Sequence, residues 1–137
     1  MVVVEVAEPG PPEGFRLARR PLPEPAAGEV LLKVSAAGVN RADVMQRQGK
    51  YPPPPGASDI LGLEVSGIVV MVGEGVRTLA LDEHVCALLT GGGYAEYCVV
   101  PVVQCLPCPV GVSLIDAAAL PEAVSYTHLT LPTILLV

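Results

Sequence analysis

Four polar residues in the first half of the chain have side chains and spacings that could serve a chemical function. They are Asn40, Asp43, Tyr51 and Glu64. An amide or a phenol hydroxyl can bond a carbonyl oxygen, and a phenol ring can also stack on a flat ligand. Simpler interpretations stay open, with Asn40 as a helix N-cap and Tyr51 as an ordinary surface ring. Asp43 could likewise form a surface ion pair with Arg47, four residues further along a helix.

The cysteines are the other group with chemical potential. The chain has Cys86, Cys98, Cys105 and Cys108, and the last two have the CxxC spacing of some metal and redox sites. A structural zinc needs two such pairs, or one pair and histidine, and Cys86 and Cys98 do not form a second pair. We therefore predict that the cysteines pack as small apolar side chains, with metal binding and redox chemistry as the alternatives.

The histidines and glycine clusters carry weaker signals. His84 lies in a strand pattern and is predicted to face solvent, and His128 lies near the C-terminus and is given no catalytic role. Gly73 and Gly75 lack the third glycine and the following helix of a dinucleotide-binding fingerprint, so we predict a plain turn there. The Gly91–Gly93 run could form a phosphate nest, but we favour a hairpin loop between two strands.

Composition excludes several classes of protein. The net charge is −6 and the eight basic residues form no cluster, which argues against nucleic-acid binding. No run approaches the roughly 18 apolar residues of a membrane span, and the N-terminus lacks the features of a signal peptide. We expect a cytoplasmic protein with no membrane partner, in which the cysteines are reduced.

Fifteen prolines and fourteen glycines divide the chain into short segments, a pattern typical of many short strands. Strands are predicted at residues 2–7, 15–19, 29–36, 64–72, 83–89, 94–100 and 103–106. The first two should pair with each other. Within 29–36, residues 30, 32 and 34 should face one side and residues 31, 33 and 35 the other. The predicted fold is mainly β, a partly open barrel with two or three short helices.

The helices are predicted from capping signals. A short helix over residues 41–48 should begin after Asn40 and end at Gly49. A second should begin at Ser113, with Asp116 completing a capping box. Pro52–Pro55 must form a rigid loop, because proline cannot continue a helix or a central strand.

Several motifs, in order and with consistent spacing, resemble one known family. They are Asn40-Arg-Ala-Asp43, Gln46-Arg-Gln-Gly49 with Tyr51, the proline loop, Gly62-x-Glu64-x-x-Gly67, Ala87–Tyr97 and Ala117–Ala123. Over residues 1–123 the chain is similar to the zinc-free, NADPH-dependent quinone oxidoreductases of the medium-chain dehydrogenase/reductase superfamily. The resemblance implies that residues 1–123 are a GroES-like catalytic domain, followed in an intact enzyme by a Rossmann domain.

The resemblance also implies an activity, namely hydride transfer from NADPH to a quinone or a related electrophilic carbonyl compound. Asn40 would lie beside the nicotinamide, and Tyr51 would line the substrate pocket. Asp43 and Glu64 would be buried supporting groups, and Met45 stands where many relatives have tyrosine. The main NADPH-binding domain would be missing from this chain, and a homodimer is expected for the full-length enzyme alone.

The same resemblance predicts that zinc is absent. The zinc alcohol dehydrogenases of the superfamily have cysteine where this chain has Asn40 and histidine where it has Leu63. An amide and an isobutyl group cannot replace a thiolate and an imidazole as zinc ligands. The four-cysteine structural lobe of those enzymes is absent as well.

The resemblance stops after Ala123. Residues 124–133 are similar to the translation of a transposase-type sequencing adapter, so we predict that 124–137 is a non-native tail that packs poorly. A natural divergent tail is the alternative. The 137-residue chain alone is then expected to be inactive. A standalone GroES-like module with a binding or assembly role, without catalysis, is the alternative function.

Overall fold

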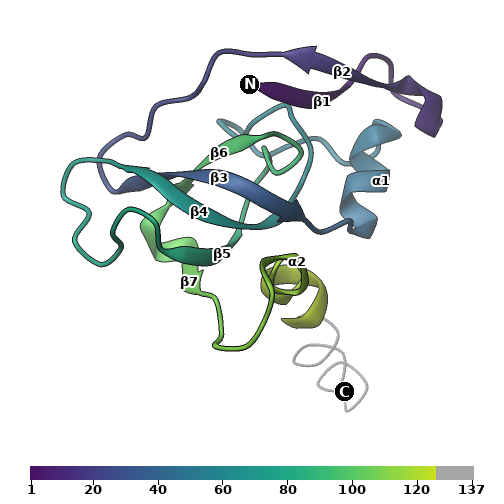
Figure 1. The fold of residues 1–137 in the computed structure, drawn as a ribbon. Coiled ribbons are helices and arrows are strands. Elements are labelled where there is room, and N and C mark those ends of the chain that lie inside the picture. The colour runs from purple at the N-terminus through teal and green to yellow at the C-terminus, as the bar shows by residue number, and fades with distance from the viewer. Residues whose placement is uncertain (126–137) are drawn as a thin grey trace.

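The computed structural model describes residues 1–125 and is built around one five-stranded sheet (Figure 1). Its strands are β3 (Glu29–Ala37), β4 (Glu64–Val72), β5 (His84–Leu88), β6 (Tyr97–Pro101) and β7 (Cys105–Pro107), in the antiparallel order β6-β3-β4-β5-β7. A separate two-stranded ribbon is formed by β1 (Val2–Val6) and β2 (Phe15–Arg19), which pair as predicted. This arrangement confirms the predicted mainly β fold.

The helical segments are all short. They are α1 (Arg41–Arg47), α2 (Leu114–Ala117), the 3-10 turns η1 (Pro12–Gly14) and η2 (Val102–Gln104), and the π-helical turn η3 (Leu120–Val124). No helix within residues 1–125 has the length and apolar character needed to cross a membrane. The predicted boundary of the non-native tail falls inside η3, and residues 126–137 lie outside the described residues.

The centre of the sheet is the β3–β4 pair. Val30 and Leu32 on β3 pack in one apolar cluster with Val65 and Val69 on β4, and all four are buried. The predicted alternation of β3 is therefore confirmed. Leu31 is buried too, although it lies on the other side of the strand. The β3–β4 pair in turn holds β6 along β3 and β5 along β4, and β7 pairs with β5.

The predicted hairpin at Gly91–Gly93 is wrong. Strand β5 pairs with β4 and β7, whereas β6 pairs with β3 at the far edge of the sheet. The glycine run instead crosses the domain and bonds to residues 60–62, with the Gly92 N–H 2.7 Å from the Ile60 carbonyl oxygen. A Cβ on Gly93 would lie 3.1 Å from backbone atoms of Gly62, so the glycines permit a close approach of two chain segments.

Two predicted strands have different limits in the structure. The first residues of the predicted 94–100 strand make an isolated bridge, Val3 to Ala95, and β6 begins at Tyr97. The predicted 103–106 strand is a 3-10 turn followed by β7, and the N–H of Cys105 closes that turn on the Val102 carbonyl oxygen. Pro101 precedes the turn and has no N–H to donate to a ladder, which favours the end of the strand there.

Both predicted helix starts are confirmed. Asn40 is the N-cap of α1, and Gly49 follows the helix with a φ of 73°. At α2, the Ser113 hydroxyl accepts the Asp116 N–H at 3.1 Å and donates to the Asp116 carboxylate at 2.8 Å. The capping side chains thus set where each helix begins.

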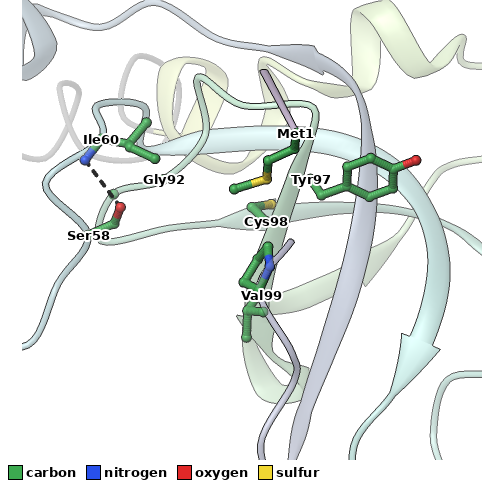
Figure 2. Close-up of a pocket in the computed structure, with 9 residues that line it drawn as sticks. Met1, Ser58, Ile60, Gly92, Tyr97, Cys98 and Val99 are labelled. Atoms are coloured by element: carbon green, nitrogen blue, oxygen red, sulfur yellow. Dashed lines mark hydrogen bonds between the residues drawn. The ribbon is translucent and has the colours of Figure 1, made fainter. Parts of the chain in front are cut away.

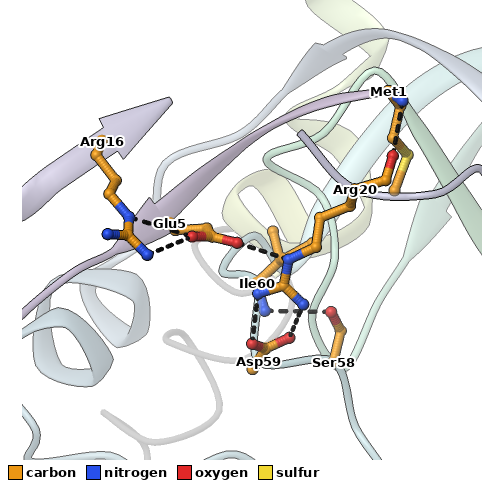
Figure 3. Close-up of polar contacts among 7 residues, drawn as sticks. All are labelled: Met1, Glu5, Arg16, Arg20, Ser58, Asp59 and Ile60. Atoms are coloured by element: carbon orange, nitrogen blue, oxygen red, sulfur yellow. Dashed lines mark hydrogen bonds and ion pairs between the residues drawn. The ribbon is translucent and has the colours of Figure 1, made fainter. Parts of the chain in front are cut away.

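An ionic cluster fixes the ribbon against the loop that follows the prolines (Figure 3). Arg20 lies between Glu5 and Asp59, with N–O distances of 2.6 Å and 2.9 Å. Glu5 also accepts from Arg16 at 3.1 Å. The cluster holds the segment that leads into residues 60–62, which is the segment that the glycine run contacts.

We predict that Gly67→Ala strongly destabilises the domain. A Cβ at this position of β4 would lie 2.3 Å from the Lys33 carbonyl oxygen on β3, and a backbone oxygen cannot move aside. Urea denaturation should show a loss of about 3 kcal/mol in the free energy of unfolding. The control is Gly75→Ala, where φ is 78° and no atom lies within 4 Å. It should cost about 1 kcal/mol, and an equal loss in both variants would contradict the prediction.

Candidate active site

Two buried carboxylates form the base of the candidate site. Asp43 on α1 is 3% exposed, and Glu64 at the start of β4 is fully buried. Within residues 1–125 neither carboxylate makes an ion pair with lysine or arginine. Each must therefore be stabilised by N–H and O–H donors, because a buried carboxylate without hydrogen bonds is very costly.

Asp43 joins three segments of the chain. Its carboxylate accepts the backbone N–H of Asn40 at 2.8 Å, the N–H of Gly62 at 3.2 Å and the hydroxyl of Tyr94 at 2.9 Å. The alternative of a surface ion pair with Arg47 is wrong. The Arg47 side chain instead donates to the Gly10 carbonyl oxygen at 3.0 Å.

Glu64 joins a different pair of segments. One of its oxygens accepts from Asn40 Nδ2 at 2.9 Å, and the other accepts the backbone N–H groups of Glu122 and Ala123 at 2.8 Å and 3.3 Å. The carboxylate packs so closely on Gly38 that a Cβ there would lie 2.1 Å from it. Glu64 thus links the start of α1 with the backbone of η3.

Asn40 consequently lies between the two carboxylates, with its backbone bonded to one and its side chain to the other. It is half-buried. Tyr51 lies beyond the end of α1 with 41% of its surface exposed, and within residues 1–125 it makes no hydrogen bond with this network. Met45 is half-buried on α1. The structure brings Asn40, Asp43 and Glu64 together, whereas the role of Tyr51 stays a prediction.

Tyr94 is a member of the network that sequence reasoning did not single out. The signal lay in the glycine run before it, which lets residues 91–94 approach residues 60–62. Burial, together with the neighbouring Asp43 carboxylate, raises the pKa of the Tyr94 hydroxyl well above its usual range. The hydroxyl therefore stays protonated as a donor to Asp43.

Two hollows lie near these elements. One of about 130 Å³ is bordered by Phe15, Val39, Asp43, Val44, Arg47 and Tyr94. The other, of about 180 Å³, runs along β6 beside Ile60, Cys98 and Val99 (Figure 2). None of the predicted site residues lines this second hollow, so it belongs to a different part of the surface.

Three of the four cysteines pack as small apolar side chains, as predicted, and Cys108 is half-buried. Cys86 and Cys98 are buried, Cys98 belongs to the central apolar cluster, and Cys105 packs against that cluster. Burial raises the pKa of Cys98 to about 12 and that of Cys105 to about 11. Within residues 1–125, no three cysteine, histidine or acidic side chains are grouped in a way that could hold a metal ion. His84 is exposed, as predicted.

Comparison with known proteins gives the family. The model of the alcohol dehydrogenase GroES-like domain matches residues 26–110. The chain belongs to this family. This GroES-like domain resembles the crystal structure of human synaptic vesicle membrane protein VAT-1 homolog-like protein with a TM-score of 0.83 and 35% identity. That match covers 89% of this chain and 40% of the other.

A second structure and a curated relative agree with that assignment. Escherichia coli quinone oxidoreductase complexed with NADPH matches with a TM-score of 0.78 and 29% identity, over 87% of this chain and 36% of that one. The Mus musculus synaptic vesicle membrane protein VAT-1 homolog-like is 36% identical over 107 residues, which make up 78% of this chain and 26% of the relative. The GroES-like domain thus spans about a quarter of that relative, and the predicted superfamily is confirmed.

We predict that the domain loses stability at alkaline pH. The pKa of Cys98 is about 12 in the folded state against an ordinary value of 9.0, so the folded state favours the protonated thiol. This contribution is fully present below pH 9 and is lost as pH rises from 9 towards 12. Each pH unit in that window should cost about 1.4 kcal/mol for Cys98, with Cys105 and Tyr94 acting in the same direction.

Urea denaturation at pH 7.5, 9 and 10.5 measures this loss. Cys98→Ala should be less stable at pH 7.5 but should show a smaller fall between pH 9 and 10.5. An equal fall in both proteins would show that ionisation of Cys98 is not its cause.

Proposed function

We propose that this GroES-like domain is the substrate-binding part of a zinc-independent oxidoreductase that transfers hydride from NADPH to quinones or related electrophilic carbonyl compounds. The observation that carries the proposal is the half-buried amide of Asn40, held between two buried carboxylates at the start of α1. A fixed amide can donate to a carbonyl oxygen without reorganising when charge develops there. The similarity to a quinone oxidoreductase complexed with NADPH supports the same class of reaction.

The chain's own residues would bind and orient the substrate. Asn40 would donate to an oxygen beside the nicotinamide, and Tyr51 would stack its exposed ring on the quinone and bond its oxygen. Asp43 and Glu64 would hold Asn40 in place, and Met45 would border the same region. NADPH, when bound, would supply the hydride.

The proposed role of this chain in NADPH binding is limited to one end of the cofactor. A pyrophosphate is held by N–H groups at a helix N-terminus that follows a glycine-rich turn. In the described residues, Gly73–Gly75 forms a turn closed by the Val76 N–H, and Gly91–Gly93 bonds to residues 60–62 instead. We infer that this chain supplies the nicotinamide side through Asn40. A Rossmann domain in the intact, dimeric enzyme would bind the rest, and its sequence would decide between NADPH and NADH.

The two zinc-ligand positions support zinc independence. The Asn40 amide nitrogen donates to Glu64, and an amide is a poor substitute for a thiolate. Leu63 is half-buried beside Glu64 and has no donor atom in its side chain.

We expect the purified chain to contain no stoichiometric zinc, because both of these ligand types are replaced. Elemental analysis after dialysis against dilute zinc and then buffer is the measurement. One zinc per chain would contradict zinc independence. Cys105→Ser and Cys108→Ser would then show whether the metal is held by the CxxC pair.

We expect the intact protein encoded at the genomic locus of this chain to bind NADPH and to reduce quinones with it, and the 137-residue chain to do neither. The genomic sequence also tests whether residues 124–137 are native. In the intact protein, Tyr51→Ala should lower quinone turnover roughly 10- to 1000-fold. Tyr51→Phe removes only the hydroxyl, so the difference between the two variants gives the contribution of the ring.

Tyr97→Phe on β6 is the matched control and should leave turnover unchanged. Unchanged turnover in Tyr51→Ala would remove Tyr51 from the site. An intact protein that folds but never oxidises NADPH would favour a binding or assembly module over an enzyme.

A further inference from the structure

The orientation of the Asn40 side chain is set by a group that can only accept. Asn40 Nδ2 lies 2.9 Å from Glu64 Oε1, and a carboxylate offers lone pairs and no N–H. The amide nitrogen, and not the amide oxygen, must therefore face Glu64. Nδ2 carries two N–H groups. One binds Glu64, and the other has no hydrogen-bond partner among residues 1–125 and can donate to a ligand.

The second oxygen of the same carboxylate is bonded to the other end of the described chain. Glu64 Oε2 accepts the N–H of Glu122 at 2.8 Å and that of Ala123 at 3.3 Å. Both N–H groups belong to η3, more than fifty residues away in sequence. One buried group thus serves Asn40 with one oxygen and the η3 backbone with the other.

Glu64 has little freedom to serve one partner without the other. The residue is fully buried, and its carboxyl group occupies the space that a Cβ on residue 38 would need. A shift of η3 would leave Oε2 without donors in an apolar setting, which is costly, so the carboxyl group would follow η3 and move away from Asn40. The geometry couples two sites through a single side chain.

We propose that Glu64 is a positioning residue that holds an Asn40 N–H towards the substrate side and makes this orientation depend on the seating of η3. The catalytic consequence rests on the proposed function, whereas the coupling itself does not. Residues 120–124 are then part of the site's regulation, because any movement of this segment changes the amide that meets the ligand's carbonyl oxygen.

Ser66 supplies a matched control. Its hydroxyl donates to the Leu114 carbonyl oxygen and so also ties the C-terminal helices to β4. In the part of the chain that the structure describes, Ser66 forms no hydrogen bond with Asn40. A substitution there weakens the attachment of α2 to β4 and leaves both hydrogen bonds between Glu64 and η3 in place.

The coupling is tested on the chain itself by NMR. In the unsubstituted chain, the Asn40 side-chain N–H bonded to Glu64 should exchange with solvent at least about tenfold slower than a free amide. Glu64→Gln and Gly38→Ala should speed this exchange together with that of the Glu122 N–H, whereas Ser66→Ala should leave Asn40 unchanged. Fast exchange at Asn40 in the unsubstituted chain would overturn the proposal even if the variants do not fold.

A double-mutant cycle in the intact enzyme tests the catalytic consequence. When Asn40 is unchanged, Glu64→Gln should lower kcat/KM of the intact enzyme about tenfold. When Asn40→Ala is already present, the same substitution should lower kcat/KM less than about twofold. Equal factors in both backgrounds would overturn the positioning role. If the intact parent protein shows no quinone reduction, the proposed function fails, and the exchange experiment still decides the coupling.

Discussion

Asp43 and Glu64 are buried carboxylates with no lysine or arginine partner among residues 1–125, and they constrain this domain more than any other group. Burying an unpaired charge costs many kcal/mol unless hydrogen-bond donors surround it. Asp43 and Glu64 together collect backbone N–H groups, one amide and one phenol hydroxyl from segments that are distant in sequence. The loop before β4, the start of α1, the glycine run and η3 must each arrive in place, because a missing donor would leave a buried charge exposed to apolar surroundings.

Glycine makes this convergence possible. Two backbone segments, residues 60–62 and 91–94, can approach each other at the network since neither Gly62 nor Gly93 carries a Cβ, and Gly62 adopts a φ of 106°. Gly38 makes equivalent room for the carboxyl group of Glu64. The main role of these glycines is to leave room for close packing. The surrounding hydrogen bonds restrict the backbone conformations that glycine could otherwise adopt.

The sequence predicts the parts of this fold that depend on local patterns. Strands β3 and β4 follow from apolar alternation and β-branched runs, and the helix starts follow from capping residues. The path of Gly91–Gly93 could not be predicted in the same way, because a glycine run suits a hairpin and a long crossing equally well. The partners of Asp43 could not be predicted from local sequence either. Its position four residues before Arg47 on a helix suggests an ion pair, but its partners Gly62 and Tyr94 lie on other segments. At the site, the Asn40 cap could be predicted, whereas the Tyr94 contribution depends on tertiary structure.

The packing of the cysteines has a consequence for the chemistry proposed here. Quinones are electrophiles, and they alkylate thiolates much faster than thiols. Burial raises the pKa of all four cysteines, and Cys86 and Cys98 are almost without solvent contact. At neutral pH the domain therefore presents very little thiolate to a reactive carbonyl compound. If the proposed function holds, the same packing protects the domain from alkylation by the quinones that it would bind.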